Sequence, residues 1–158
     1  MDNIRTLQGD LVARDLRVAI IASRFNDAIV EHLVRGAVDA LLRHGASEKQ
    51  IEIVRVPGAY DLPFVAKRVA ASKRCDTIVA LGVVIRGATP HFDYVCSTCA
   101  SGLARASDET GVPIAFGVLT TDTIEQAVER AGTKAGNKGA DAAMVALELA
   151  NLLRRLAV

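Results

Sequence analysis

One segment of the chain combines small residues, a hydroxyl and a histidine in a pattern that suits proton transfer beside an anion. Gly87, Ala88 and Thr89 directly precede Pro90 and His91, where a helix is expected to begin. Small residues let backbone N–H groups approach an anion, and the dipole of the following helix favours negative charge there. His91, in the first helical turn, can then take and give protons. The alternative is an ordinary helix start with a turn glycine and no ligand.

Basic residues further along the chain offer a second set of anion contacts. Arg130 falls in the last turn of a short predicted helix, where a cation also suits the helix dipole without any ligand. Lys134 and Lys138 lie in the glycine-containing connection 132–139 and are either cationic contacts or solvated loop charges. The glycine-rich nucleotide-binding patterns do not occur, so a single phosphate fits this sequence better than a dinucleotide.

Aromatic residues are scarce, at 4% with no tryptophan, yet they gather near the predicted strand ends. Only Phe64 has the position of a core residue on a helix face. The collective placement of the others favours a planar ligand stacked at the rim of a sheet, against the alternative that rings merely fill gaps. The rings at or near strand ends are Phe25, Tyr60, Phe92, Tyr94 and Phe116.

The three cysteines do not form a recognisable metal or redox motif. Cys96 and Cys99 fall inside a predicted helix, and no second pair completes a zinc site. We expect these two thiols and that of Cys75 to pack as small apolar groups.

Composition limits the classes of protein. The 158 residues suit one domain, 1–158, and 51% hydrophobic with 23% charged residues excludes a disordered chain. A net charge of +1 gives no electrostatic case for a nucleic-acid partner. No apolar stretch is long enough to span a membrane, and the first residues lack a signal-peptide pattern. We therefore expect a cytoplasmic protein with reduced thiols and no membrane contact.

Short β-branched runs alternate with longer helical patterns along the chain. Strands are expected at 16–22, 51–56, 77–84 and 113–119, and helices at 26–45, 62–73, 90–108, 122–131 and 137–156. Asn26, Thr89 and Asn137 occupy the expected helix N-caps. This alternation predicts an α/β protein with a doubly wound parallel sheet, a three-layer α/β/α sandwich in flavodoxin-like order, with 1–15 as an arm or an extra edge strand. Ligands in such sheets bind outside the carboxyl ends of the strands, which selects 23–26, 57–61, 85–91 and the segment from Phe116.

Four motifs together resemble the 6,7-dimethyl-8-ribityllumazine synthase family. They read SRFN at 23–26, VPGAYDLP at 56–63, GVVIRGATPHFDY at 82–94 and ERAGTKAGNKG at 129–139. The resemblance runs in order from about residue 16 to 153, nearly the whole chain. It implies a flavodoxin-like sandwich and a transferase that joins 5-amino-6-(D-ribitylamino)uracil to 3,4-dihydroxy-2-butanone 4-phosphate. The implied products are the lumazine, phosphate and water, in the penultimate step of riboflavin biosynthesis, without a metal or an organic cofactor.

The resemblance also implies residue roles. His91 would donate and accept protons, and Phe25 would stack on the pyrimidine ring. Ala88 and Thr89 would bind the phosphate, joined by Arg130. The remaining implied contacts are Ala59, Tyr60 and Asp61 along the ribityl and pyrimidine region, backbone groups of Val83, Val84 and Ile85 on the ring, and Phe116 and Lys138 from a neighbouring subunit.

Two positions depart from the family pattern. Asp61 stands where the family often has Glu, which leaves the ribityl contact open, and Tyr60 replaces Phe or Trp.

The family implies homo-pentamers, and the short 132–139 connection resembles members that build icosahedral shells of twelve pentamers. A mainly structural, shell-forming relative with reduced activity is the alternative. A signalling receiver domain is excluded, because the first strand ends in Ala22, Ser23 and Arg24 instead of paired acids.

Overall fold

A four-stranded parallel sheet forms the centre of the computed structural model, which describes residues 3–157. Its strands are β1 (Val18–Ser23), β2 (Ile51–Val56), β3 (Thr77–Ile85) and β4 (Ile114–Thr121), in the order β2-β1-β3-β4. β1 and most of β3 are buried, as expected for central strands of a parallel sheet covered on both faces. The predicted α/β fold and flavodoxin-like order are confirmed.

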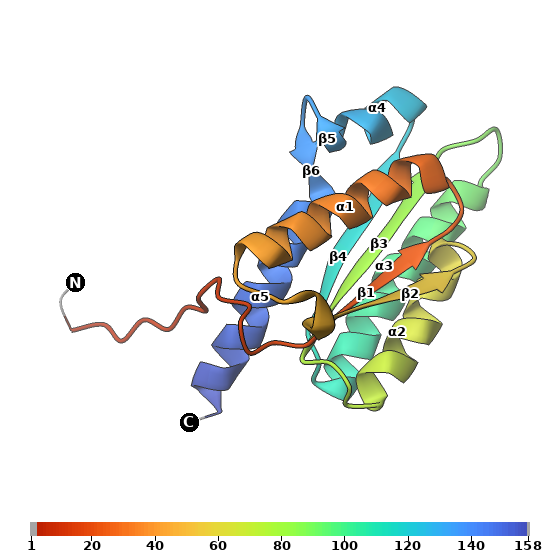
Figure 1. The fold of residues 1–158 in the computed structure, drawn as a ribbon. Helices are drawn as coiled ribbons and strands as arrows, with labels where there is room; N and C mark the ends of the chain where they lie inside the picture. Colours follow the sequence, from red (N-terminus) through yellow and green to blue (C-terminus); the bar gives the residue numbers. More distant parts are fainter. Residues whose placement is uncertain (1–2, 158) are drawn as a thin grey trace.

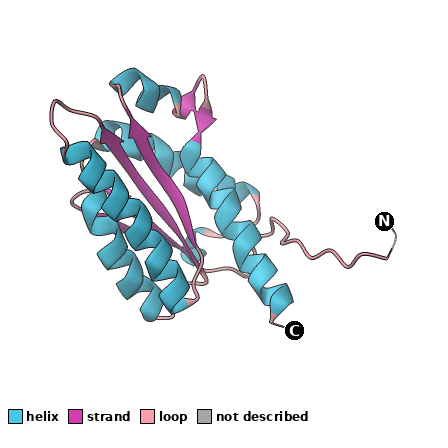
Figure 2. Ribbon diagram, turned by 180° about the vertical axis from the view of Figure 1, so that it is seen from behind, coloured by secondary structure: helices cyan, strands magenta, loops and turns pink. Residues whose placement is uncertain are grey.

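Helices cover both faces of the sheet (Figures 1 and 2). The long helices are α1 (Asp27–Arg43), α2 (Leu62–Ala71), α3 (His91–Thr110) and α5 (Lys138–Leu156). Val18 and Ile20 of β1 pack with α1 and α5, whereas Ala19 and Ile21 pack with α2 and α3. The alternation of side chains along the strand therefore produces two cores and the expected three layers.

The segment after β4 differs from its predicted form. α4 spans only Ile124–Glu129, because Thr123 caps it by accepting a hydrogen bond from the Gln126 N–H at 3.2 Å. The expected loop that follows contains an antiparallel hairpin, β5 (Ala131–Thr133) and β6 (Gly136–Asn137). Strands this short leave no periodic pattern in the sequence.

Two of the three predicted helix caps act differently from the prediction. Asn26 precedes α1, but its backbone is left-handed, with φ 61°, and its side chain does not cap the helix. α3 begins at His91 with Pro90 in the cap position, one residue later than predicted, so Thr89 is not the cap. Asn137 does cap α5, accepting hydrogen bonds from the N–H groups of Gly139 and Ala140 at 2.9 and 3.1 Å.

The N-terminal segment is an arm without a strand in its described part, residues 3–17 (Figure 1). Asn151 on α5 donates to the carbonyl oxygens of Asp10 and Val12 at 2.9 and 3.0 Å, and Arg155 donates to Gln8 at 2.6 Å. Of the two expected forms, the arm is therefore observed and the edge strand is not. Within residues 3–157, no helix has the length and apolar character needed to cross a bilayer.

Candidate active site

A cavity of about 440 Å³ opens beyond the carboxyl ends of β1, β2 and β3. We call it the strand-end pocket. It is formed by the loops after these three strands and by the first turns of α3. Its lining residues are Phe25, Asn26, Pro57, Gly58, Ala59, Tyr60, Asp61, Val83, Val84, Ile85, Gly87, Thr89, His91, Phe92 and Val95.

Backbone hydrogen bonds join the loops that form this pocket. The N–H groups of Arg24 and Phe25 donate to the carbonyl oxygens of Val56 and Pro57 at 2.8 and 3.0 Å. Asn26 donates from Nδ2 to the Val83 carbonyl oxygen at 3.0 Å, which links the β1 loop to β3. Asn26 was predicted only as a cap; its left-handed conformation explains why its amide reaches the sheet instead. Phe25, 72% exposed, is thereby held at the rim on a fixed loop.

The end of β3 presents backbone groups to the pocket. β1 pairs with β3 only as far as Ala22 and Leu81, whereas β3 stays paired with β4 up to Ile85 and Thr121. The segment 83–85 therefore has one edge without a strand partner, and Val83, Val84 and Ile85 all line the pocket. An edge of this kind can hydrogen-bond a planar ligand as it would a neighbouring strand.

Asp61 has a local hydrogen-bond partner in addition to its expected place along the ribityl region. Its Oδ2 accepts a hydrogen bond from the Gly58 N–H at 2.9 Å and so closes the turn formed by η2 (Ala59–Asp61). The spacing of Gly58 and Asp61 is that of a capping box, in which the side chain three residues on returns to the cap N–H. The carboxylate thus fixes the loop that carries Tyr60.

The segment before α3 is exposed throughout residues 86–91. Gly87, Thr89 and His91 line the strand-end pocket, and Ala88 lies between them in the chain without lining it. The N-terminus of the 20-residue helix α3 is thus at the pocket together with a hydroxyl and an imidazole. This combination can hold an anion and move protons beside it.

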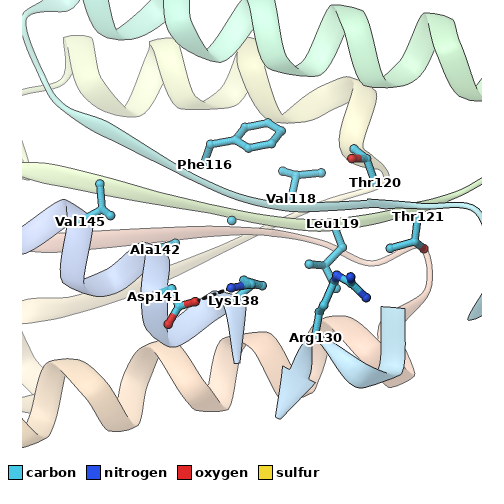
Figure 3. Close-up of a pocket in the computed structure, with 11 residues that line it drawn as sticks. Phe116, Val118, Leu119, Thr120, Thr121, Arg130, Lys138, Asp141, Ala142 and Val145 are labelled. Carbon is cyan, nitrogen blue, oxygen red and sulfur yellow. Dashed lines mark hydrogen bonds and ion pairs between the residues drawn. The ribbon is translucent and has the colours of Figure 1, made fainter. Parts of the chain in front are cut away.

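A second cavity, of about 390 Å³, runs along the outer edge of β4 (Figure 3). We call it the edge pocket. β4 is the last strand of the sheet, so this edge has no strand partner within residues 3–157. The lining residues are Phe116, Gly117, Val118, Leu119, Thr120, Thr121, Arg130, Lys138, Asp141, Ala142 and Val145.

The β5–β6 hairpin brings the two cations of the edge pocket together. The Lys138 N–H donates to the Arg130 carbonyl oxygen at 2.9 Å, so both side chains start from adjacent backbone. Each cation has a partner in the same chain: Arg130 donates to the Gln126 carbonyl at 2.9 Å, and Lys138 lies 2.9 Å from Asp141. Phe116 lies on the opposite side of β4 from both cations (Figure 3) and is 48% exposed.

The predicted site residues therefore fall into two groups within one chain. Phe25, Tyr60, Thr89 and His91 share the strand-end pocket with the other residues expected around a pyrimidine. Phe116, Arg130 and Lys138 share the edge pocket. Arg130, expected beside Ala88 and Thr89, thus lines a different cavity of this chain.

Two aromatic residues were wrongly assigned. Phe64, expected in the core, is 67% exposed, and the guanidinium of Arg68 lies 5.4 Å from its ring centroid. Tyr94, expected among the rings at the rim of the sheet, is 72% exposed on α3 and does not line the strand-end pocket. Phe92 is half-buried and does line the strand-end pocket.

The thiols lie in apolar surroundings. Burial raises the pKa of Cys99 to about 12 and that of Cys75 to about 11, and the pKa of Cys96 is also raised by desolvation. The three cysteines are free and at least half-buried. Protonated, partly or fully buried thiols of this kind act as packing groups and not as nucleophiles.

The fold and the strand-end pocket define a flavodoxin-like α/β protein with a ligand site at the carboxyl ends of its strands. The model of the 6,7-dimethyl-8-ribityllumazine synthase family matches residues 15–154. The chain belongs to this family.

Proteins named 6,7-dimethyl-8-ribityllumazine synthase from three organisms are similar over nearly their full length. The protein from Syntrophus aciditrophicus is 60% identical over 149 residues, 94% of this chain and 97% of its own. Those from Chlorobium limicola and Chloroherpeton thalassium are 56% identical over 152 and 154 residues, covering 96% and 98% of this chain and 98% and 99% of their own.

Proposed function

We propose that this protein condenses 5-amino-6-(D-ribitylamino)uracil with 3,4-dihydroxy-2-butanone 4-phosphate to give 6,7-dimethyl-8-ribityllumazine, phosphate and water. The observation that carries the proposal is the family match over residues 15–154, which includes the whole strand-end pocket. The reaction is a step of riboflavin biosynthesis. It uses small-molecule substrates in the cytoplasm and requires no cofactor.

In this proposal the strand-end pocket holds the pyrimidine. Phe25 stacks on the ring, the free edge of Val83–Ile85 hydrogen-bonds its polar edge, and the segment 59–61 faces the ribityl chain. The pocket supplies an exposed ring on a tied loop for the first contact and, for the second, a strand edge without a strand partner, on which the Val83 carbonyl already accepts from Asn26. Asp61 contributes to the ribityl region mainly by fixing its loop.

The chemistry needs proton transfers and a place for the departing phosphate. The 5-amino group attacks the ketone and water leaves to form a Schiff base, phosphate is eliminated, and ring closure follows with loss of a second water. Holding both reactants in one pocket accounts for much of the acceleration. His91 donates and accepts the protons, and Ala88, Thr89 and the α3 N-terminus stabilise the anion.

The two pockets are proposed to meet between neighbouring subunits. Phe116, Arg130 and Lys138 of one subunit would close the strand-end pocket of the next and add two cations to the phosphate site. Two observations support this arrangement: the edge of β4 is free, and Phe116 is 48% exposed on it. A ring of five subunits satisfies such a head-to-tail contact, and the short hairpin between β5 and β6 suits further assembly into an icosahedral shell.

A direct assay tests the reaction. The purified chain is mixed with both substrates, and lumazine absorbance and fluorescence are followed together with released phosphate. Both products are expected in equal amounts. Light scattering and negative-stain imaging of the same sample distinguish a shell from a free pentamer. An intact shell that forms no lumazine would support the structural alternative.

Subunit mixing tests the shared site. At ketose phosphate concentrations below the KM, His91→Ala and Arg130→Ala should each have low activity alone, because each lacks one half-site. When the two variants are unfolded together and reassembled, about a quarter of the sites should receive both intact halves, and activity should rise accordingly. If both halves belong to one chain, mixing restores nothing.

A further inference from the structure

Arg86 occupies a position that joins three parts of the strand-end region. Its Nε donates to Asp122 Oδ1 at 2.8 Å, and its Nη1 lies 3.4 Å from Asp93 Oδ1. The guanidinium carbon lies 4.2 Å from the ring centroid of Phe92. Asp122 belongs to the connection after β4, whereas Phe92 and Asp93 are in the first turn of α3.

The backbone of Arg86 holds the same place. Its N–H donates to the Thr121 carbonyl oxygen at 2.9 Å, which extends the β3–β4 pairing by one residue. Main chain and side chain thus both contact the end of β4, while the guanidinium also reaches over the 87–90 loop to α3. We call this set of contacts the Arg86 clamp.

The loop under the clamp has few other restraints. Residues 87–90 are exposed, and a methyl group at Gly87 would meet no atom within 4 Å. Among the side-chain hydrogen bonds of residues 3–157, none is made by residues 87–90. The position of Thr89 and His91 relative to the sheet therefore depends on what holds the two ends of this loop.

One exposed ion pair would be too weak for this purpose, since such pairs contribute little to stability. Here one planar guanidinium makes two carboxylate contacts and one aromatic contact at once. The three contacts share the entropy cost of ordering one side chain. The hydrogen bond to Asp122 raises the pKa of Arg86, as expected for a cation used in this way. The positive charge of Arg86 also partly neutralises the carboxylates of Asp93 and Asp122 beside the proposed phosphate site.

We propose that Arg86 is a positioning residue: its clamp holds the 87–90 loop and the first turn of α3 so that Thr89 and His91 face the strand-end pocket. The inference rests on the proposed function for its kinetic part. The arrangement of the loop itself is independent of which substrate is bound.

Three variants test the clamp. Arg86→Met largely keeps the length of the side chain but removes both carboxylate contacts and the cation–π contact. Arg86→Lys keeps the charge without the planar fork. Arg74→Met is the matched control, because Arg74 is a similarly exposed arginine at the opposite end of β3, paired with Glu52 at 3.2 Å.

Hydrogen–deuterium exchange of the purified variants gives the first readout. In Arg86→Met, the two hydrogen-bonded amides that flank the loop, at position 86 and at Asp93, should exchange about tenfold faster, while the sheet and the rest of α3 keep their protection. Arg86→Lys should give an intermediate rate, and Arg74→Met should match the unmodified chain. Unchanged exchange at these two amides, or the same change in Arg74→Met, overturns the proposal.

Steady-state kinetics gives the second readout. Arg86→Met should lower kcat/KM for the phosphorylated ketose about tenfold, because small misplacements of reacting groups are costly. The KM for the pyrimidine should stay within about twofold, since Phe25 and the β3 edge do not depend on the clamp. A lower melting temperature with unchanged kinetic constants would indicate a purely structural role and reject the inference. If the unmodified chain forms no lumazine, the proposed function fails, while the exchange result still decides whether the clamp holds the loop.

Discussion

The strand-end pocket and the edge pocket differ in what fixes their functional groups. In the first, the loops are tied to one another and to β3 by the hydrogen bonds of Arg24, Phe25 and Asn26, and a strand edge forms one wall. In the second, the edge strand β4, Arg130 before the β5–β6 hairpin and the first turns of α5 carry the side chains. Arg130 and Lys138 there are held by neighbouring groups of their own chain. The strand-end pocket is therefore preformed. The edge pocket is open along β4 and is completed only when a second surface covers that edge.

This difference separates two tasks. The preformed pocket can select and orient a planar ring before any reaction. The edge pocket offers an exposed ring and two cations to whatever covers β4. The predictions below test this division, beginning with the largest expected effect.

Replacing the proton-transfer group should have the largest effect. His91→Ala should lower kcat by about 100-fold or more, because general acid–base catalysis contributes about 10²–10⁴. The dissociation constant of the pyrimidine substrate should stay nearly unchanged, measured by calorimetry. His32→Ala, on the exposed side of α1, is the control and should behave as the unmodified chain. Equal loss of pyrimidine binding would show that the strand-end pocket does not separate binding from proton transfer.

The support of the edge pocket can be broken at the crossing of α1 and α5. A methyl group at Gly139 would overlap the Leu33 carbonyl oxygen, so Gly139→Ala must push the two helices apart. We expect a loss of about 3 kcal/mol in the free energy of unfolding, measured by urea titration. Gly87→Ala adds a methyl group in open space and should change stability by less than about 0.5 kcal/mol. An unchanged Gly139→Ala would mean that the crossing tolerates a larger separation.

Removing the edge-pocket cation should affect one substrate only. Arg130→Ala should raise the KM for the phosphorylated ketose about tenfold, as expected for the loss of one charge-assisted contact, and leave the KM for the pyrimidine unchanged. Arg43→Ala, an exposed arginine paired with Asp39 on α1, serves as the control. An equal rise in both KM values would contradict the division of tasks between the pockets.

The smallest effect should come from releasing Lys138. Asp141→Asn removes the acid that lies 2.9 Å from its ammonium group. Because both side chains are exposed, the pair contributes little, and we expect a change of about threefold or less in the KM for the ketose phosphate. Fluorescence assays over a range of salt concentrations should show a stronger salt dependence than for Arg130→Ala, because Asp141→Asn keeps both cations whereas Arg130→Ala removes one. A larger effect than that of Arg130→Ala would show that Lys138 contributes more than Arg130 to the KM for the ketose phosphate.

The parallel sheet and its order could be predicted because the central strands are short apolar runs separated by helical patterns. Phe64 shows where such patterns fail. The buried face of α2 consists of Leu62, Ala66, Val69 and Ala70, at helical spacing, and Phe64 lies about 200° from Leu62 around the helix. When alanines form the buried stripe, the largest apolar residue need not belong to it.

The candidate site could be predicted from the sequence only where the order of strands and loops along the chain determines which residues meet. The loops after β1, β2 and β3 converge because parallel strands end at one edge, so the lining of the strand-end pocket could be anticipated. The bond from Asn26 to Val83, the pairing of Arg130 with Lys138 and the Arg86 clamp join segments distant in the sequence. No local spacing encodes such contacts, since they depend on how the finished layers bring the ends together.

The open edge of β3 has a consequence for how specificity can change over time. At Val83 and Ile85 the donors and acceptors on this edge belong to the main chain, and the Val83 carbonyl among them already accepts from Asn26. Substitutions of these side chains do not alter the alternation of main-chain N–H and C=O groups, so this part of the site stays the same when the sequence changes. Substitutions elsewhere can change the shape of the pocket around a planar ligand. The hydrogen-bonding pattern that the ligand must match is set by the main chain of β3.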